Sequence, residues 1–306
     1  MIDYTSTANI EGVKRRATLP DNAQGLFPDD DICKILTAEL HSDIVPLLMG
    51  VAEEFFLHNK DHDIVSGTNY YEIPARAAGQ KLKDVVLLDS SGNESILSRI
   101  DPSEIKHSSV KGFHFEDDRV RLLPDGATYS QFDLRMKYFR RPNNIVETTD
   151  AGRITAINTG TRQVTIANLP VAWTTSTTFD FIKGTPGFKS RADDQAISAI
   201  NSASKILTFS SALPDGLIVG DWVAESGFSP IAQIPYDVHP LLEQRAVIKI
   251  LEGLGDREGM SAAGDVYKDM VDKFMVLVTP RSDGTPKKII SRNPLFGGSS
   301  RRPPWW

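Results

Sequence analysis

The 306-residue sequence contains one cysteine, Cys33, so no internal disulfide stabilises it. A lone cysteine also excludes every zinc site that needs two or more cysteine ligands. Cys33 falls in a helical pattern of apolar residues, where a buried structural thiol is the expected role. The fold must therefore depend on packing, hydrogen bonds and ion pairs.

The sequence also lacks a run of the ~18–20 apolar residues that a membrane-spanning helix needs. Met1–Thr7 is polar, and the early basic group Lys14–Arg16 is not followed by the apolar core of a secretion signal. Hydrophobic residues make up 40% and charged residues 24%, as in ordinary soluble globular proteins. We expect no membrane contact and folding in the cytoplasm of the producing cell.

Motifs of common enzyme classes are missing. There is no Gly-x-Ser-x-Gly nucleophile elbow, no phosphate-binding Gly-x-x-x-x-Gly-Lys-Ser/Thr loop and no His-Glu-x-x-His zinc motif. The spacing Gly253-x-Gly255-x-x-x-Gly259 misses the dinucleotide-binding pattern and joins two predicted helices, so it indicates an interhelical turn. The sequence predicts no enzymatic activity and no cofactor.

Three clusters of polar residues have the composition of a metal or an acid–base site. His58 and His62, with Asp61 and Asp63, are the closest approach to a metal-ligand set, but a solvated connection after a helix is favoured over a metal site. The pairs Asp117-Asp118 and Asp193-Asp194 are interpreted as solvated loop carboxylates, because nothing apolar beside them would shift their pKa values. No catalytic, cofactor or metal residue is therefore predicted.

Acidic residues are scarce at the C-terminal end, although the net charge of the chain is −6. From Arg281 onward there are six basic residues against one acid, Asp283, and the segment is rich in proline and glycine. Such a segment builds no core and stays extended. A basic tail on an acidic body predicts contact with an acidic partner, either nucleic acid or a protein surface.

Helical periodicity occurs at both ends of the chain. Asp29-Asp30-Asp31 is typical of a helix start, and an apolar stripe continues from Ile32 to Phe55 with a kink, or two abutting helices, expected at Pro46. Two more helices are predicted between Tyr236 and Val278. We expect these two to form an antiparallel pair packed against the first helix.

Strand patterns fill residues 66–146. Tyr70–Ile73 and Val85–Leu88 are β-type runs, and Phe132–Phe139 alternates between an apolar and a largely charged face. Residues 1–27 are polar and without periodicity, so an extended N-terminal arm is predicted for them.

Residues 147–234 contain an internal repeat. Ile154–Pro170 matches Ile197–Pro214 at a starting offset of 43, with one extra residue in the second copy. Each copy predicts a β-hairpin followed by Leu-Pro and a further strand, and neither copy buries enough apolar area alone. We expect the two to pack as a small β-sandwich or barrel, inserted into the larger domain.

These patterns predict an α+β fold with a helical bundle core, formed by the long N-terminal helix and the C-terminal helix pair, associated β-strands and an inserted all-β repeat domain. The predicted divisions are an extended arm at 1–27, a first core part at 28–146, the repeat insertion at 147–234, a second core part at 235–279 and an extended C-terminal tail at 280–306.

Several segments together resemble a known protein family. They are Tyr70–Ala77, Asp101–Ile105, Leu134–Pro142, Gln233–Asp237 and Pro280–Ile289, and the likeness covers roughly residues 28–146 and 235–296. The sequence in these segments resembles the head-to-tail adaptor (connector) proteins of podovirus-like tailed bacteriophages, while the repeat region departs from a minimal adaptor.

The resemblance implies a structural virion protein, assembled in the host cytoplasm and located at the head–tail junction. In that family a helical wall forms a homo-oligomeric ring, with twelve copies expected, beneath the portal protein, and tail or nozzle proteins attach below. DNA passes through the ring without sequence-specific binding, which an acidic body favours.

The resemblance also assigns portal contact to the tail. Paired tryptophans beside paired arginines have the composition of an interface anchor. The predicted portal-docking residues are Pro294, Leu295, Phe296, Arg301, Arg302, Trp305 and Trp306.

Two alternatives stay open. The chain could be a tail tube or nozzle component of the same junction, which a β-rich ring with few helices would favour. It could also be a carbohydrate-binding module, with Trp173 and Trp222 of the repeat region as sugar platforms or, equally, as core residues.

Overall fold

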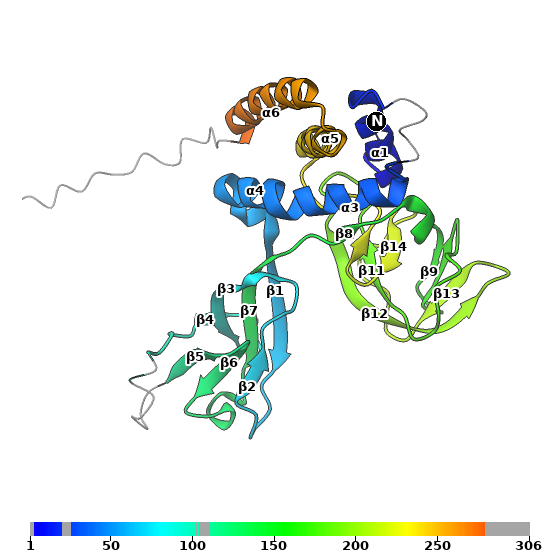
Figure 1. Ribbon diagram of the computed structural model, residues 1–306. Coiled ribbons are helices and arrows are strands. Elements are labelled where there is room, and N and C mark those ends of the chain that lie inside the picture. Colours follow the sequence, from blue (N-terminus) through cyan, green and yellow to red (C-terminus); the bar gives the residue numbers. More distant parts are fainter. Residues whose placement is uncertain (1–2, 20–25, 102, 104–110, 279–306) are drawn as a thin grey trace, which may run out of the picture.

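A computed structural model describes residues 3–19, 26–101, 103 and 111–278. It has three parts (Figure 1): a helical layer, a sheet unit formed by strands β1–β7 (residues 57–140), and a barrel formed by strands β9–β14 (residues 151–225). The sheet unit and the barrel lie on the same side of the helical layer, side by side. Each part has its own apolar cluster.

The helical layer comes from the two ends of the described chain. Its helices are α1 (Ser6–Arg16), α3 (Asp29–Glu39), the π-helical turn η1 (Leu40–Ile44), α4 (Val45–Ala52), the 3-10 turn η2 (Glu53–Phe56), α5 (His239–Leu254) and α6 (Arg257–Val278). As predicted, α3 begins at the three aspartates and α4 carries Pro46 in its first turn, directly after η1. Gly255, with a φ of 74°, ends α5 in the left-handed conformation that glycine adopts without steric cost.

The predicted helical bundle core is wrong. The described chain is mixed and rich in sheet, at 33% helix and 33% strand. Figure 1 shows α3 and α4 running across the view while α5 is seen almost end-on, so α5 crosses the α3–α4 run. α5 and α6 do fold back on each other, since Gln244 Nε2 donates to the Ala263 carbonyl at 3.1 Å and Arg245 lies over the Tyr267 ring at 5.7 Å. The physical reason is that two β units bury their apolar side chains in clusters of their own, which leaves the helices as one layer among three parts.

The predicted extended N-terminal arm is also wrong where the structure describes it, because residues 6–16 form α1. Its buried face is partly polar and small, which hides the helical period. Gly12 lies against α5: a Cβ there would come within 2.9 Å of the Glu243 carboxyl group. Arg16 pairs with the same carboxylate at 3.0 Å.

The helical run Asp29–Phe56 is long and apolar enough to cross a membrane by length and composition alone. Its apolar side chains, however, face the core of the helical layer. Ile32, Leu36, Leu40, Ile44 and Leu48 are each fully buried there. This run is the central core helix of the layer.

The sheet unit is two sheets packed face to face. One has the order β1-β7-β3-β4 and the other β2-β6-β5. The strands are β1 (Leu57–Asp63), β2 (Tyr70–Glu72), β3 (Ala77–Leu88), β4 (Glu94–Ile96), β5 (Gly112–Glu116), β6 (Arg119–Leu123) and β7 (Asp133–Arg140). Leu134, Met136 and Tyr138 of β7 face the opposite sheet, so the predicted alternation of this strand is confirmed.

The stretch around His58 and His62 is a strand and not the predicted helix end. It forms β1, which pairs antiparallel with β7 from Leu57↔Phe139 to Asp63↔Asp133. Its polar composition is compatible with a strand because Asp61 faces Arg135 across the ladder. The run Asp101-Pro102-Ser103-Glu104 has the residue types of a helix start, but Pro102 and Glu104 lie outside the described residues.

The repeat forms a closed six-stranded barrel of order β10-β13-β12-β11-β14-β9. The strands are β9 (Ala151–Asn158), β10 (Gln163–Ile166), β11 (Thr178–Ile182), β12 (Ser190–Asn201), β13 (Ile206–Phe209) and β14 (Trp222–Glu225). Exchanging the two copies exchanges β9 with β12, β10 with β13 and β11 with β14, and the same neighbours result. The barrel therefore has an internal pseudo-twofold arrangement.

The register supports this pseudo-symmetry residue by residue. Val164 pairs with Leu207, its own repeat counterpart, and the flanking pairs Gln163↔Thr208 and Thr165↔Ile206 are related by the same exchange. The short strands β8 (Asn144–Ile145) and β15 (Phe228–Ser229) pair in parallel and enclose the barrel segment in the chain. The barrel was one of the two forms that the repeat predicted.

Candidate functional site

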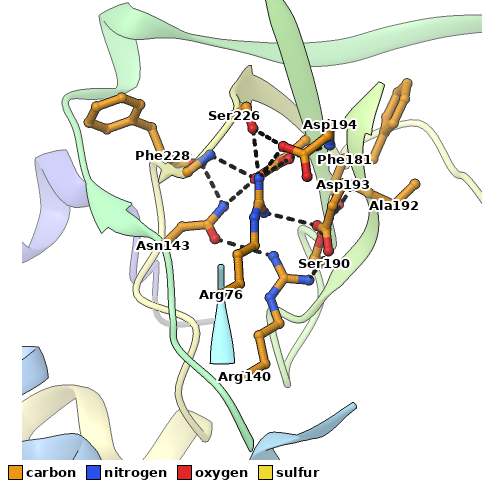
Figure 2. Close-up of polar contacts among 12 residues, drawn as sticks. Arg76, Arg140, Asn143, Phe181, Ser190, Ala192, Asp193, Asp194, Ser226 and Phe228 are labelled. Carbon is orange, nitrogen blue, oxygen red and sulfur yellow. Dashed lines mark hydrogen bonds and ion pairs between the residues drawn. The ribbon is translucent and has the colours of Figure 1, made fainter. Parts of the chain in front are cut away.

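A network of charged side chains joins the sheet unit to the barrel (Figure 2). Arg76 lies in the turn before β3 and Arg140 ends β7, both on the sheet side. Asp180 on β11 and Asp193 on β12 face them from the barrel. We call this set, with Asn143, Asp194 and Ser226, the ionic junction.

Asp180 is the centre of the junction and its carboxylate is fully buried. It accepts five hydrogen bonds: from Arg76 Nη1 (2.6 Å) and Nη2 (3.0 Å), Asn143 Nδ2 (2.7 Å), and the backbone N–H groups of Asp194 (3.0 Å) and Gly227 (3.0 Å). A buried carboxylate is tolerated only when it is paired and its lone pairs are satisfied. Asp180 meets both conditions, and the pairing cation comes from the other unit.

The two arginines extend the network across the boundary. Arg76 also donates to Ser226 Oγ and to Asp194 Oδ1, each at 2.7 Å, and lies 3.2 Å from Asp193 Oδ1. Arg140 Nη1 donates to Asp193 Oδ2 at 2.5 Å and Nη2 to Asn143 Oδ1 at 3.2 Å. Figure 2 shows the two guanidinium groups side by side, pointing at the barrel carboxylates.

Charge pairing sets the protonation states of the junction. Burial alone would raise the pKa of Asp193, but Arg140 and Arg76 hold the pKa of this carboxyl below its usual range. Burial works to lower the pKa of Arg76, yet the hydrogen bond and charge of Asp180 raise it. The ion pairs therefore persist across the whole range of physiological pH.

Beside the junction lies a polar cleft of about 780 Å³ between the sheet unit and the barrel. Its walls include His58, Lys60, Tyr138 and Asp194 together with both junction arginines. Burial lowers the pKa of His58, whose ring meets Tyr138 edge-on at 5.6 Å. The carboxylates here already accept from arginine, serine and backbone donors, so the arrangement suits mechanical coupling of two units better than proton transfer.

The interpretation of Asp193-Asp194 as solvated loop carboxylates is wrong for Asp193. Both residues lie on β12, and the Asp193 side chain is 19% exposed where that of Asp194 is 61% exposed. The sequence did not predict the lowered pKa of Asp193, because Arg140, whose charge lowers it most, lies more than fifty positions away in the chain. Asp117 and Asp118 lie at the β5–β6 turn, as a solvated pair would.

The barrel also contains a buried aspartate–arginine pair of its own, directly before β14. Asp221, also buried, accepts from Arg191 Nε at 2.6 Å and from the backbone N–H groups of Gly184 (3.0 Å) and Ile218 (3.1 Å). One aspartate is thus paired within the barrel and the other by the sheet unit.

Neither histidine of the predicted closest metal-ligand set takes part in such a set. Within residues 3–19, 26–101, 103 and 111–278, no group of three or more histidine, cysteine or carboxylate side chains could hold a metal ion. His62 instead lies 6.1 Å from the Tyr71 ring. Cys33 is buried in the helical layer, and burial raises the pKa of its thiol to about 12, as a structural thiol requires.

The predicted portal-docking residues Pro294, Leu295, Phe296, Arg301, Arg302, Trp305 and Trp306 lie outside the described residues. The sequence offered no signal for the ionic junction itself, since Arg76 and Asp180 are 104 positions apart. The Arg140-Arg141 pair at the end of a strand was the only local hint of a charged contact.

Comparisons with known proteins were made against family models and curated sequences. No protein-family model matches this chain, and no curated protein matches it significantly.

Proposed function

We propose that this chain is a structural virion protein of a tailed bacteriophage, one subunit of the homo-oligomeric adaptor ring between the portal and the tail. Its partners are further copies of itself, with twelve expected, the portal protein and tail or nozzle proteins. DNA passes through the ring without sequence-specific binding. The protein acts by assembly and not by catalysis.

The observation that carries the proposal is the ionic junction. A ring subunit must present its contact surfaces at one fixed angle, because every copy repeats the same contacts. Here three separately packed parts are held in one arrangement, and buried ion pairs of defined geometry join two of them. Bidentate arginine–carboxylate pairing adds directional specificity, which supports a rigid framework.

The end of α6 supports partner docking. Val276 and Leu277 in its last turn are 60% and 74% exposed, and the basic tail with its predicted anchors follows directly in the sequence. Apolar side chains on a helix that continues into a basic, tryptophan-containing segment fit a segment that binds another protein. The acidic remainder of the chain fits a passage along which DNA slides, since a basic wall would hold the duplex.

A second candidate function has a specific observation in its favour. The fold is sheet-rich, with two β units and a single helical layer, which is closer to the expectation for a tail tube or nozzle component than the sequence suggested. Both candidates place the chain at the same junction. They differ in which neighbour it binds first.

The two tryptophans that the carbohydrate-binding alternative needs as sugar platforms are both buried. Trp173 is 8% exposed and packs edge-on against Phe179 at 4.7 Å inside the barrel, and Trp222 is 7% exposed against the helical layer. A sugar platform needs an open aromatic face. Binding of glycans by the 147–234 fragment would revive this alternative.

The test is negative-stain microscopy of the portal ring from the same virus, mixed with full-length protein or with a version that ends at Pro280. We expect the full-length protein to add a second ring beneath the portal and the shortened version to add none. A matched full-length variant, W305A/W306A with R301A/R302A, separates the loss of the predicted anchors from the loss of chain length.

Each result decides a different part of the proposal. If the shortened version also adds the ring, the adaptor function stands and the docking assignment of the tail is wrong. If neither form binds the portal, the adaptor function is overturned. Binding to purified tail tube or nozzle subunits would then establish the second candidate.

A further inference from the structure

A small pocket lies where the three parts of the molecule meet, and Arg140 is one of its lining residues. Phe55 and Phe56 of η2 and Pro142 form apolar walls, and Lys189 of the barrel and Gln233 close it. Its volume is about 60 Å³. No acidic side chain lines this pocket, whereas the neighbouring cleft contains Asp193 and Asp194.

Two buried donors of the pocket lining have no hydrogen-bond partner in the part of the chain that the structure describes. They are Nε of Arg140, a residue 9% exposed, and Nε2 of Gln233, a residue 5% exposed. Their other polar atoms are fixed: Arg140 Nη1 bonds Asp193, and Gln233 Oε1 accepts from the Asn143 backbone N–H at 2.9 Å. Buried donors without partners are rare, because each one forfeits its hydration.

Lys189 adds an unpaired cation. Its ammonium lies 4.5 Å from the centre of the Phe55 ring, and it forms no ion pair with any described residue. Burial and the nearby charge of Lys183 lower the pKa of Lys189, so the pocket disfavours the positive charge that it holds. A bound anion would remove this disadvantage.

Charge and size together define the ligand. Of the two cations that line the pocket, Arg140 is paired with Asp193, while Lys189 has no acidic partner among the described residues, so Lys189 is the charge that a bound anion would compensate. A pocket of this volume holds about four water molecules at about 15 Å³ each. Four non-hydrogen atoms and one negative charge describe a carboxylate group on a single carbon.

We propose that this pocket binds one carboxylate group of the size of acetate, with Lys189, Arg140 and Gln233 as the donors. The group belongs either to a free short-chain acid or to an acidic side chain of a bound protein, since the end of an aspartate side chain has the same chemistry. The proposal does not depend on the virion function. Because Phe55, Lys189 and Gln233 come from different parts of the fold, the ligand would tie those parts together.

The test is the thermal midpoint of the full-length protein at pH 7 and constant ionic strength. Sodium acetate is titrated against sodium chloride and against neutral acetamide, and N-acetyl-aspartyl amide represents an acidic side chain. We expect a saturable rise with acetate that acetamide and chloride do not reproduce. A rise with acetate alone assigns a free acid, and a rise with the blocked aspartate as well assigns an acidic side chain.

Three variants locate the effect. Lys189→Met keeps the aliphatic stem and should weaken acetate binding at least tenfold. Lys183→Met removes a cation from the same hairpin but outside the pocket, and it should change acetate binding far less than Lys189→Met does. Gln233→Glu supplies a carboxylate from the chain itself, so acetate should no longer raise the midpoint. Equal responses of wild type and Lys189→Met, or no difference between acetate and acetamide, would show that the pocket holds only water.

Discussion

The barrel carries two buried aspartates, which differ in where the pairing arginine comes from. Asp221 is paired by Arg191 from its own barrel, while Asp180 is paired by Arg76 from the sheet unit. Both also accept a backbone N–H from a glycine, Gly184 for Asp221 and Gly227 for Asp180. One acidic site is thus internal to the barrel, and the other is a joint between two units.

The difference teaches how a stable module gains a fixed orientation to its neighbour. On the Asp221 side, the barrel itself supplies the cation that pairs the buried carboxylate. On the Asp180 side, the sheet unit supplies the cation that pairs the buried carboxylate. The cost of an unpaired buried carboxylate makes the docked arrangement strongly preferred.

The barrel's contact with the helical layer is of the opposite kind. Phe188 and Trp222 of the barrel pack with Tyr4 and Ile231 in an apolar cluster. His239, at the start of α5 and fully buried, stacks on Tyr4 at 4.4 Å and meets the Phe188 ring edge-on at 5.2 Å. One face of the barrel is therefore held by charge and another by apolar packing around a neutral histidine.

Arg76→Ala should have the largest effect on stability. It leaves Asp180 buried without its cation, which costs about 3–5 kcal/mol of unfolding free energy, measured by urea denaturation. Arg191→Ala is the matched variant at the barrel's internal pair and should destabilise the barrel. Only Arg76→Ala should also change the X-ray scattering profile and speed hydrogen exchange where sheet unit and barrel meet. Equal changes for both variants would contradict the role of Asp180 as a joint.

Acid should weaken the apolar joint before the ionic one. Burial lowers the pKa of His239 to about 3, while the Ile234 backbone only partly favours its protonated form. Its folded pKa lies below the unfolded value of 6.5, so its stability contribution is complete above pH 6.5 and is lost as pH falls toward 3, by about 3 kcal/mol at pH 4.

Asp193 has the other dependence. Its depressed pKa means that its contribution is present above the unfolded value of 3.8 and is lost only below it. His239→Phe should flatten the urea-measured stability between pH 6.5 and 4, leaving the smaller slope of His41, His58 and His62, whose pKa values burial also lowers. An unchanged profile in this variant would show that His239 does not govern the acid response.

Substitution of the two glycines that donate to the aspartates should have smaller effects on stability, and the two effects should differ in size. A Cβ at Gly184 would lie 2.1 Å from the backbone oxygen of Gly220, so Gly184→Ala must move backbone and should cost about 1–3 kcal/mol. Gly227 has a φ of 86° and open space around it, so Gly227→Ala should cost about 1 kcal/mol from backbone strain alone. The reverse order in thermal denaturation would refute this assignment.

The smallest effect is expected for an exposed ion network on the sheet unit. Arg135 bridges Asp61 at 2.7 Å and Glu94 at 2.8 Å on the solvent face. Arg135→Ala should cost about 0.2–1 kcal/mol, and 1 M salt should remove most of the difference. The loss caused by Arg76→Ala should persist in the same salt, because its partner is buried.

Local sequence patterns predicted the elements whose residues carry their own signals. The aspartate start of α3, the glycine end of α5 and the alternation of β7 depend on neighbours a few positions away. Two elements escaped prediction because their partners lie far along the chain. α1 has a small, polar buried face that makes sense only against α5, and β1 is polar because it pairs with β7.

The sequence by itself determined that no internal disulfide forms, that helices stand at both ends of the chain and that a duplicated β module lies between them. The repeat also determined the pseudo-twofold symmetry of the barrel, because two similar copies can each form half of it. Only the tertiary structure decided that the helices form a layer instead of a bundle core and that Arg76 reaches Asp180. The local spacing of residues determines which segments become helices or strands. Packing and long-range charge pairing depend instead on which surfaces are left to be buried once these elements have formed.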